Sequence, residues 1–345
     1  MPPMNEVEAV PAINTTLTER VVYQPIHPSI RPLLDPEYVT FHDRYVQYVR
    51  PEQLEPWSPH VRTRFTWPYS GSPLTPVGKV QDIRIDSDFT IRAFSPATST
   101  TTSRRPVVIW LHGGGFVGGN IDSDNDLCSL ICKKADCVVL NVDYRLAPEH
   151  PYPAAIDDVM ETLKWVSSDR GVQELGIDRT KIVIGGASAG GNLATVGALL
   201  AAQLSIPIML QVLVVPVTDN TATLETLWSS YPHAPGLTAP RMTWFRDLYI
   251  SNPPQQRDWQ LSPLYAPTEL LSQLPKTWIA IAGQDMLSTE GLAYGELLRK
   301  AGVQTDMRVY DGMPHAMMAL SGVLKQGRQC LEDVVEIIRG TLQAN

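Results

Sequence analysis

The stretch KIVIGGASAGGNLATVGALLAAQ at residues 181–203 joins an apolar run to a turn of small residues and then to an Ala- and Leu-rich segment. Ser188 lies in that turn, in a GxSxG pattern. Such a serine occupies a tight corner between strand and helix, where bulky neighbours clash, which explains Gly186 and Gly190 on either side. The stretch predicts three successive elements: a strand over residues 181–184, a break at Gly185 and Gly186, and a helix over residues 192–203.

A second stretch, RPVVIWLHGGGF at residues 105–116, has the same organisation. Residues 107–111 form a continuous apolar run, typical of a strand that is buried on both faces. Three glycines follow, and without Cβ atoms they can approach a ligand closely and direct bare N–H groups at one atom. The N–H groups of Gly113 and Gly114, with that of Ala189 at a helix N-terminus, can stabilise an oxyanion. Either motif alone also fits a turn without chemistry, but together they indicate a serine hydrolase.

The base that such a serine needs is predicted near the C-terminal end. A serine hydroxyl is a weak nucleophile until a base takes its proton. Of the seven histidines, only His233 and His315 follow Ser188. A chain order of Ser, then Asp or Glu, then His places the base in a loop after the last strand, and His315 follows the strand predicted at residues 306–310. We therefore predict His315 as the base and interpret His233 as a surface or structural residue.

The carboxylate that orients this base is expected in the loop after the preceding strand. Residues 278–282 predict that strand, and Asp285 follows its end. Glu290 is a second choice, because it is expected in the first turn of a helix that begins near Ser288, where an acid favours the helix dipole. Asp285 is the predicted acid.

Five motifs follow one another along the chain: HGGG at residues 112–115, DYRLAPEHPYPAAIDD at 143–158, GASAGGNLA at 186–194, GQDML at 283–287 and GMPH at 312–315. In this order they resemble the hormone-sensitive-lipase branch of the α/β-hydrolase esterases, over roughly residues 77 to 345. The resemblance implies an α/β-hydrolase fold with a helical cap, and it implies neither a cofactor nor a metal. It gives the same site: Ser188 as nucleophile, Asp285 as acid, His315 as base, and Gly113, Gly114 and Ala189 as the oxyanion hole.

The chain departs from this branch at one position. Many members have Asp before the serine, whereas this chain has Ala187, which leaves the subfamily and the substrate preference open. The branch also includes plant hormone receptors that have lost the histidine, so the presence of His315 favours catalysis. Arg145 and Glu149, in the YRLAPE segment, are expected to form scaffold behind the glycines rather than to take part in chemistry.

The remaining sequence predicts an α/β domain with two cap pieces. Alternating apolar residues predict an antiparallel hairpin over residues 79–94, with an acidic turn at residues 86–88. Strands and helices then alternate, which predicts a mostly parallel central sheet with helices on both faces and the site at the carboxyl ends of its strands. The further elements expected are a helix from about Asp124, a strand over 138–142, a helix over 153–166 and a strand over 208–215.

Residues 77–216 and 263–345 are thus the predicted catalytic domain. The proline-rich residues 1–76 are a predicted N-terminal cap segment, with a helix over residues 37–49 whose Tyr38, Phe41, Tyr45 and Tyr48 share a face. Residues 217–262 are a predicted irregular insertion that completes the cap. It carries six aromatic residues, which together imply an apolar pocket: Trp228, Tyr231, Trp244, Phe245, Tyr249 and Trp259. Beside the base, Met313, Met317 and Met318 fit either the pocket lining or the core.

Net charge and composition limit the classes of molecule that the protein can be expected to bind. The net charge of −8 includes no Lys/Arg run, which argues against nucleic acid and anionic membrane surfaces and favours a small neutral ester substrate. The longest apolar stretch has twelve residues, too few for membrane insertion, and residues 1–10 lack the pattern of a signal peptide. The four cysteines have no metal-ligand spacing, so we expect a reducing, cytoplasmic environment. The sequence leaves the oligomeric state undecided, and a homodimer is one alternative.

The predicted function is a serine carboxylesterase acting on short- to medium-chain or small aromatic carboxylic esters through an acyl-enzyme. Amidases, lactonases and formamidases use the same groups, and kynurenine formamidase has a related glycine loop. A ligand receptor or a non-hydrolytic cyclase on the same fold is the alternative from a different class. A lipase acting at oil interfaces is a weaker alternative, which a large exposed apolar lid would indicate.

Overall fold

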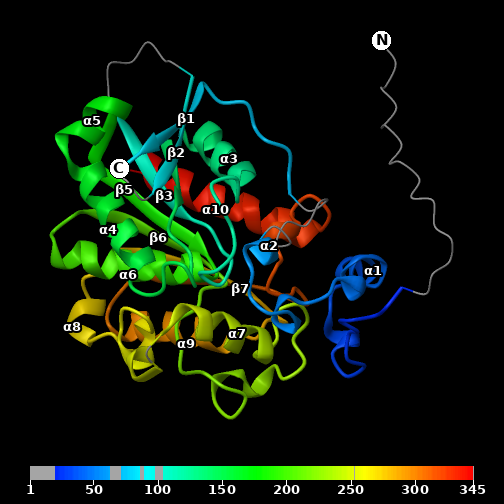
Figure 1. The fold of residues 1–345 in the computed structure, drawn as a ribbon. Coiled ribbons are helices and arrows are strands. Elements are labelled where there is room, and N and C mark those ends of the chain that lie inside the picture. The colour runs from blue at the N-terminus through cyan, green and yellow to red at the C-terminus, as the bar shows by residue number, and fades with distance from the viewer. Residues whose placement is uncertain (1–19, 63–70, 86–88, 98–103, 252, 345) are drawn as a thin grey trace, which may run out of the picture.

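The computed structural model describes residues 20–62, 71–85, 89–97, 104–251 and 253–344. An eight-stranded sheet forms the centre of this part of the chain (Figure 1), in the order β1-β2-β4-β3-β5-β6-β7-β8. Its strands are β1 Lys79–Arg84, β2 Thr90–Ser95, β3 Arg105–Leu111, β4 Val138–Asp143, β5 Ile177–Ala187, β6 Ile208–Val214, β7 Lys276–Ala282 and β8 Thr305–Tyr310.

Strands β3 to β8 are parallel to one another, and the β1–β2 hairpin joins them antiparallel through β2 and β4. The predicted mostly parallel sheet and the predicted hairpin are therefore confirmed. The turn expected at residues 86–88 lies outside the described residues. Because the parallel strands point the same way, their carboxyl ends meet at one edge, where ligands bind in open α/β sheets.

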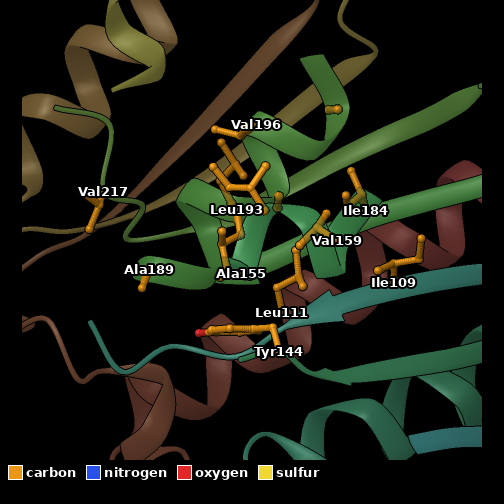
Figure 2. Packing of buried hydrophobic residues seen from close by; sticks show 14 of the residues in the cluster. Ile109, Leu111, Tyr144, Ala155, Val159, Ile184, Ala189, Leu193, Val196 and Val217 are labelled. Atoms are coloured by element: carbon orange, nitrogen blue, oxygen red, sulfur yellow. The ribbon is translucent and has the colours of Figure 1, made fainter. Parts of the chain in front are cut away.

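Helices cover both faces of the sheet (Figure 1). The α-helices are α1 Pro36–Arg44, α2 Pro59–Arg62, α3 Asn125–Ala135, α4 Ala154–Ser167, α5 Asp169–Leu175, α6 Ala189–Gln203, α7 Ala239–Tyr249, α8 Thr268–Leu271, α9 Ser288–Lys300 and α10 Lys325–Gln343. Alternate residues of the central strands enter two cores: Ile109 and Leu111 of β3 pack toward α4 and α6, whereas Trp110 packs toward α3 and α10. Figure 2 shows the first of these cores, with Val159 of α4 and Leu193 of α6 beside the strands.

The corner that carries Ser188 is more regular than its sequence suggests. The prediction that Gly185 and Gly186 break the strand is wrong, because β5 continues through both and pairs on either side up to Ala187. Gly185 instead makes room for a neighbour, since a Cβ there would lie 2.8 Å from the ring of Trp110. The helix predicted over residues 192–203 begins earlier, at Ala189, directly after the serine.

The N-terminal segment, residues 20–62, also differs from its prediction. The helix expected over residues 37–49 ends at Arg44, because Tyr45 leaves the helical region at φ −129° and ψ −55°, and the 3-10 turn η2 Val46–Tyr48 follows. The expected aromatic face is divided as a result: Tyr38 is buried, whereas Tyr45 is 39 % exposed.

The insertion, residues 217–262, is not irregular, because it contains the eleven-residue helix α7. Three contacts join it to the N-terminal segment. Glu52, in the 3-10 turn η3 Glu52–Leu54, forms a buried ion pair with Arg241 at 2.6 Å. The rings of His27 and His233 stack at 3.7 Å, and those of Trp57 and Trp244 lie 6.1 Å apart. The division of the chain into a catalytic domain and two cap pieces stays a prediction.

The sequence pattern predicts Cys128 and Cys132 as core residues, and the structure buries both. Cys128, Cys132, Cys137 and Cys330 are all buried and free. In the parts of the chain that the structure describes, we find no helix with both the length and the apolar character needed to cross a bilayer.

Candidate active site

The structure brings Ser188, Asp285 and His315 together at the carboxyl edge of the sheet. Ser188 directly follows β5, Asp285 follows β7 and His315 follows β8. The Oγ atom of Ser188 lies 2.8 Å from Nε2 of His315, and Nδ1 of His315 lies 2.8 Å from Oδ2 of Asp285. Side chains up to 127 positions apart in the sequence therefore form one continuous chain of hydrogen bonds.

Ser188 occupies the strained elbow, residues 186–190, between β5 and α6. Its φ of 55° and ψ of −116° lie outside the regions that a serine ordinarily adopts. Both flanking glycines are required by close backbone contacts. A Cβ on Gly186 would lie 2.3 Å from the carbonyl oxygen of Gly190, and one on Gly190 would lie 1.9 Å from that of Leu111. Strain of this kind clusters at functional sites.

The surroundings of Asp285 and His315 fix their hydrogen-bonding roles. Asp285 is 1 % exposed, and its other oxygen accepts a hydrogen bond from the N–H of Leu287 at 3.2 Å. An ionised carboxylate only accepts, so Nδ1 of His315 donates the proton between them. Nε2 of the imidazole is then left to accept the proton of the Ser188 hydroxyl.

The glycine loop, residues 112–116, lies directly against the elbow. A Cβ on Gly113 would be 3.3 Å from the carbonyl oxygen of Ala187. Gly114 has a φ of 126° and Gly115 a φ of 63°, which glycine tolerates and other residues rarely do. Within the described chain, the N–H groups of Gly113, Gly114 and Ala189 have no hydrogen-bond acceptor. Three free donors, one of them at the N-terminus of α6, are thus available beside Ser188.

His112 and Tyr144 support this loop from behind. Their rings stack at 4.3 Å, and the Tyr144 hydroxyl donates a hydrogen bond to the carbonyl oxygen of His112 at 2.8 Å. Nδ1 of His112 donates to the carbonyl oxygen of Gly113 at 2.7 Å. Complete burial lowers the pKa of His112 to about 4, with the Gly113 hydrogen bond opposing that shift. His112 is therefore a neutral structural residue of the loop.

The YRLAPE segment forms scaffold behind the loop, as expected, but its charged residues have their partners outside residues 144–149. Arg145 binds the buried carboxylate of Asp158, with three contacts between 2.6 and 3.1 Å. Glu149 pairs with Arg62 of α2. Arg62 also donates to the carbonyl oxygens of Val117 at 2.7 Å and Ala147 at 2.9 Å, and so joins this segment to the end of the glycine loop.

A cavity of about 260 Å³ opens over Ser188 and His315. Its walls come from both predicted cap pieces, Tyr38 and Val46 from the N-terminal segment and Leu237, Met242 and Phe245 from the insertion. Of the six aromatic residues of the insertion, only Phe245 is among the lining residues. The three methionines near the base divide in the same way: Met318 lines the cavity, whereas Met313 and Met317 are buried in the core.

Glu290 and His233, the alternatives considered for the triad, have other surroundings. Glu290 lies in the first turn of α9, as predicted, but its carboxylate does more than face the helix dipole. It accepts hydrogen bonds from the N–H groups of Thr218 and Asp219 at 2.6 and 2.9 Å and from the indole of Trp228 at 3.0 Å. Burial raises its pKa to about 8 against these three donors. Glu290 therefore holds the start of the insertion, and the exposed His233 stacks on His27.

Several residues of the site are not evident from the sequence. Arg62 lies in the proline-rich N-terminal segment, where no local pattern marks it. Tyr144 belongs to the DYRLAPE motif, which could have indicated its supporting role. Glu52 and Arg241, which join the two walls of the cavity, look like ordinary surface charges until the fold pairs them.

Comparison with known proteins identifies the family. Residues 108–319 match the model of the alpha/beta hydrolase fold family. An AB hydrolase superfamily protein of Schizosaccharomyces pombe is 38 % identical over 94 % of this chain and 98 % of its own length. Esterase LipI of Mycobacterium tuberculosis is 36 % identical over 73 % of this chain and 79 % of its own. Among solved structures, a thermostable esterase from Pseudomonas putida has a TM-score of 0.81 at 28 % identity, covering 90 % of this chain and 98 % of that one. The chain therefore belongs to the alpha/beta hydrolase fold family, among its hormone-sensitive-lipase-like esterases.

Proposed function

We propose that this chain is a serine carboxylesterase in which Ser188 is the nucleophile, His315 the base and Asp285 the acid. One observation carries the proposal: two successive 2.8 Å contacts link the Ser188 hydroxyl to His315 and His315 to Asp285, next to three unengaged N–H groups. Hydrolysis of carboxylic esters as a reaction class follows from membership of this esterase family. The residue roles and the substrate below are the finer parts of the proposal.

The first half-reaction forms an acyl-enzyme. Nε2 of His315 takes the Ser188 proton while Oγ attacks the ester carbonyl carbon. The carbonyl oxygen becomes an oxyanion that accepts hydrogen bonds from the N–H groups of Gly113, Gly114 and Ala189. Asp285 stabilises the imidazolium without taking its proton. Protonated His315 then gives its proton to the alcohol oxygen, the C–O bond breaks, and the alcohol leaves.

The second half-reaction returns the enzyme to its starting state. Nε2 of His315 takes a proton from a water molecule, whose oxygen attacks the acyl carbon on Ser188. The same three N–H groups stabilise the second oxyanion. Collapse breaks the bond to Ser188 Oγ, which recovers its proton from His315, and the carboxylic acid is released. Each residue thus acts twice, with the proton carried by one imidazole.

The cavity favours small substrates. Its volume of about 260 Å³ falls just below the range of about 300–1,000 Å³ that is usual for sites holding drug-sized ligands. Leu237, Met242 and Phe245 contribute apolar side chains to its walls, which suit the hydrocarbon part of an acyl or alcohol group. We therefore expect short- to medium-chain or small aromatic esters to be the preferred class.

The proposal is tested by hydrolysis of p-nitrophenyl esters graded from acetate to palmitate, with wild type and Ser188→Ala side by side. We expect the highest kcat/KM between acetate and octanoate, and a fall in kcat of about 10⁴- to 10⁶-fold in the variant, as triad removals cause. A fluorophosphonate should label wild type but not the variant, and circular dichroism should show that the variant is folded. Near-wild-type turnover by folded Ser188→Ala would refute the assignment.

A further inference from the structure

The cavity that contains Ser188 is also lined by an acidic residue, Asp124. Asn120, Ser123 and Asp124 line it together, between the end of the glycine loop and the start of α3. None of the three takes part in the acyl-transfer steps above. A carboxyl group on the wall of a substrate cavity that the chemistry does not use is a candidate for binding the substrate.

The backbone holds the Asp124 side chain away from its ordinary local partner. Asp124 occupies the N-cap position of α3, where an aspartate usually accepts hydrogen bonds from the first N–H groups of the helix. Here the side chain makes no such bond, and the residue has a left-handed conformation with φ 55° and ψ 19°. Aspartate adopts that conformation more readily than most residues other than glycine, because its short side chain can hydrogen-bond locally, but here the usual capping bond is left unmade.

Only one oxygen of the carboxyl group is engaged. Oδ2 accepts a hydrogen bond from the indole N–H of Trp110 at 2.9 Å. Within the described parts of the chain, Oδ1 has no hydrogen-bond donor. Holding Trp110 requires one acceptor, which a neutral asparagine would supply equally well. The second oxygen and the charge are thus left without a structural role.

No cation of the described chain compensates this carboxyl group. Three arginines of the described chain line the same cavity: Arg62 and Arg241 each pair with a glutamate, and Arg246 donates to the carbonyl oxygens of Asn220 and Ala222. The charge that acts on Asp124 is Asp126, which has the same sign. Burial, with a smaller contribution from Asp126, raises the pKa of Asp124 to about 6, although the Trp110 hydrogen bond opposes this. Asp124 is part-buried, so its charge is incompletely solvated and only Oδ2 has a donor, and a ligand group that donates to Oδ1 would stabilise it.

We propose that Asp124 binds the substrate. Its carboxylate accepts a hydrogen bond from a hydroxyl group on the ester or forms an ion pair with an ammonium group there. That group lies on a part of the substrate away from the scissile carbonyl, since Ser188 and the three N–H donors hold the carbonyl itself. The inference rests on the proposed esterase function and narrows its substrate class. It predicts a preference for polar, donor-bearing esters over alkyl esters of the same size.

The test compares kcat/KM within pairs of esters that have the same shape. 2-Hydroxyethyl butyrate and propyl butyrate differ in a hydroxyl donor on the alcohol side. Ethyl 6-hydroxyhexanoate and ethyl heptanoate differ in the same way on the acyl side. Choline butyrate and 3,3-dimethylbutyl butyrate differ in a positive charge that carries no N–H, which separates ion pairing from hydrogen-bond donation. We expect wild type to prefer the polar member of at least one pair.

The diagnostic variant is Asp124→Asn, because asparagine tolerates the left-handed conformation and keeps an acceptor for Trp110. Its matched control is Asp136→Asn, at the other end of α3. Asp136 also has a left-handed conformation, with φ 51°, but it lies outside the cavity and pairs with Arg105. The preference for the polar ester should fall about tenfold or more in Asp124→Asn, the size expected for a lost charged hydrogen bond, and stay at the wild-type ratio in Asp136→Asn.

The proposal is overturned if wild type prefers the alkyl member of every pair, which needs no variant at all. It is also overturned if Asp124→Asn lowers both members of each pair in parallel, since that outcome means a purely structural role. Failure of the esterase function looks different: wild type would hydrolyse none of the six esters, and a fluorophosphonate would leave Ser188 unlabelled.

Discussion

The two regions that enclose Ser188 are built in different ways. On one side, the elbow and the glycine loop touch backbone to backbone, so closely that a single Cβ on Gly190 would lie 1.9 Å from a carbonyl oxygen. On the other side, the cavity walls come from residues 20–62 and 217–262, which side chains such as Glu52 and Arg241 join. Backbone contacts leave almost no choice of residue, whereas side-chain contacts allow many. The chemistry of the site is therefore rigidly encoded, and its specificity is not.

Gly190→Ala is the substitution that we expect to disrupt the contact between the elbow and the glycine loop most severely. The new methyl group would meet the carbonyl oxygens of Leu111 and His112 at 1.9 and 2.4 Å, and neither backbone can yield without moving the glycine loop. We expect a loss of more than about 4 kcal/mol in the free energy of unfolding, or a folded protein with kcat lowered at least about 100-fold. Urea unfolding and ester hydrolysis measure the two effects.

The matched control for that change is Gly340→Ala. Gly340 lies near the end of α10, and a Cβ there would have no atom within 4 Å. Alanine at an exposed helical position should raise the stability by up to about 1 kcal/mol. Equal effects of the two substitutions would show that the close contacts at the elbow do not exist.

Glu52→Gln removes the ion pair that joins the two cavity walls, residues 20–62 and 217–262. Glu52 and Arg241 are 5 % and 15 % exposed, so removing the charge of Glu52 deprives a largely buried guanidinium of this ion pair. We expect a loss of about 3 kcal/mol in the free energy of unfolding, together with a raised KM because both cavity walls loosen. The exposed pair of Glu161 and Lys164 offers the control, since Glu161→Gln should change stability by less than about 0.5 kcal/mol. Indistinguishable unfolding curves for the two variants would contradict this account.

The pH dependence of the unfolding free energy gives a smaller effect, which tests the burial of His112 in the glycine loop. Its pKa is about 4 in the folded protein, below the value of about 6.5 expected in the unfolded chain. The stabilisation from neutral His112 is therefore complete above pH 6.5 and is lost as the pH falls toward 4, by up to about 3 kcal/mol. His112→Asn should show a flatter decline of unfolding free energy between pH 7 and 4.5 than wild type. His150→Asn, at an exposed histidine, should decline like wild type.

The sequence patterns located the elements of the fold better than their ends. Each predicted strand from 107–111 to 306–310 exists, because a buried parallel strand needs a continuous apolar run that few other elements share. The strand break at Gly185 was wrong because a glycine signals either a turn or a close neighbour, and the neighbour, the ring of Trp110, lies on another strand. The helix over 37–49 was overextended because the turn after Arg44 has no glycine or proline to mark it.

The sequence by itself determined the elbow at residues 186–190, the glycine loop and the order in which Ser188, Asp285 and His315 follow one another. Each depends on local geometry that only certain residues permit, and the glycines at positions 186 and 190 around Ser188 show that geometry in the sequence itself. Only the tertiary structure decided that Arg62 supports the glycine loop, that Glu290 holds the insertion and that Asp124 faces the cavity. In each case the surroundings of a charged side chain come from parts of the chain distant in sequence, and a charged residue carries no local sign of what it will meet once the chain has folded.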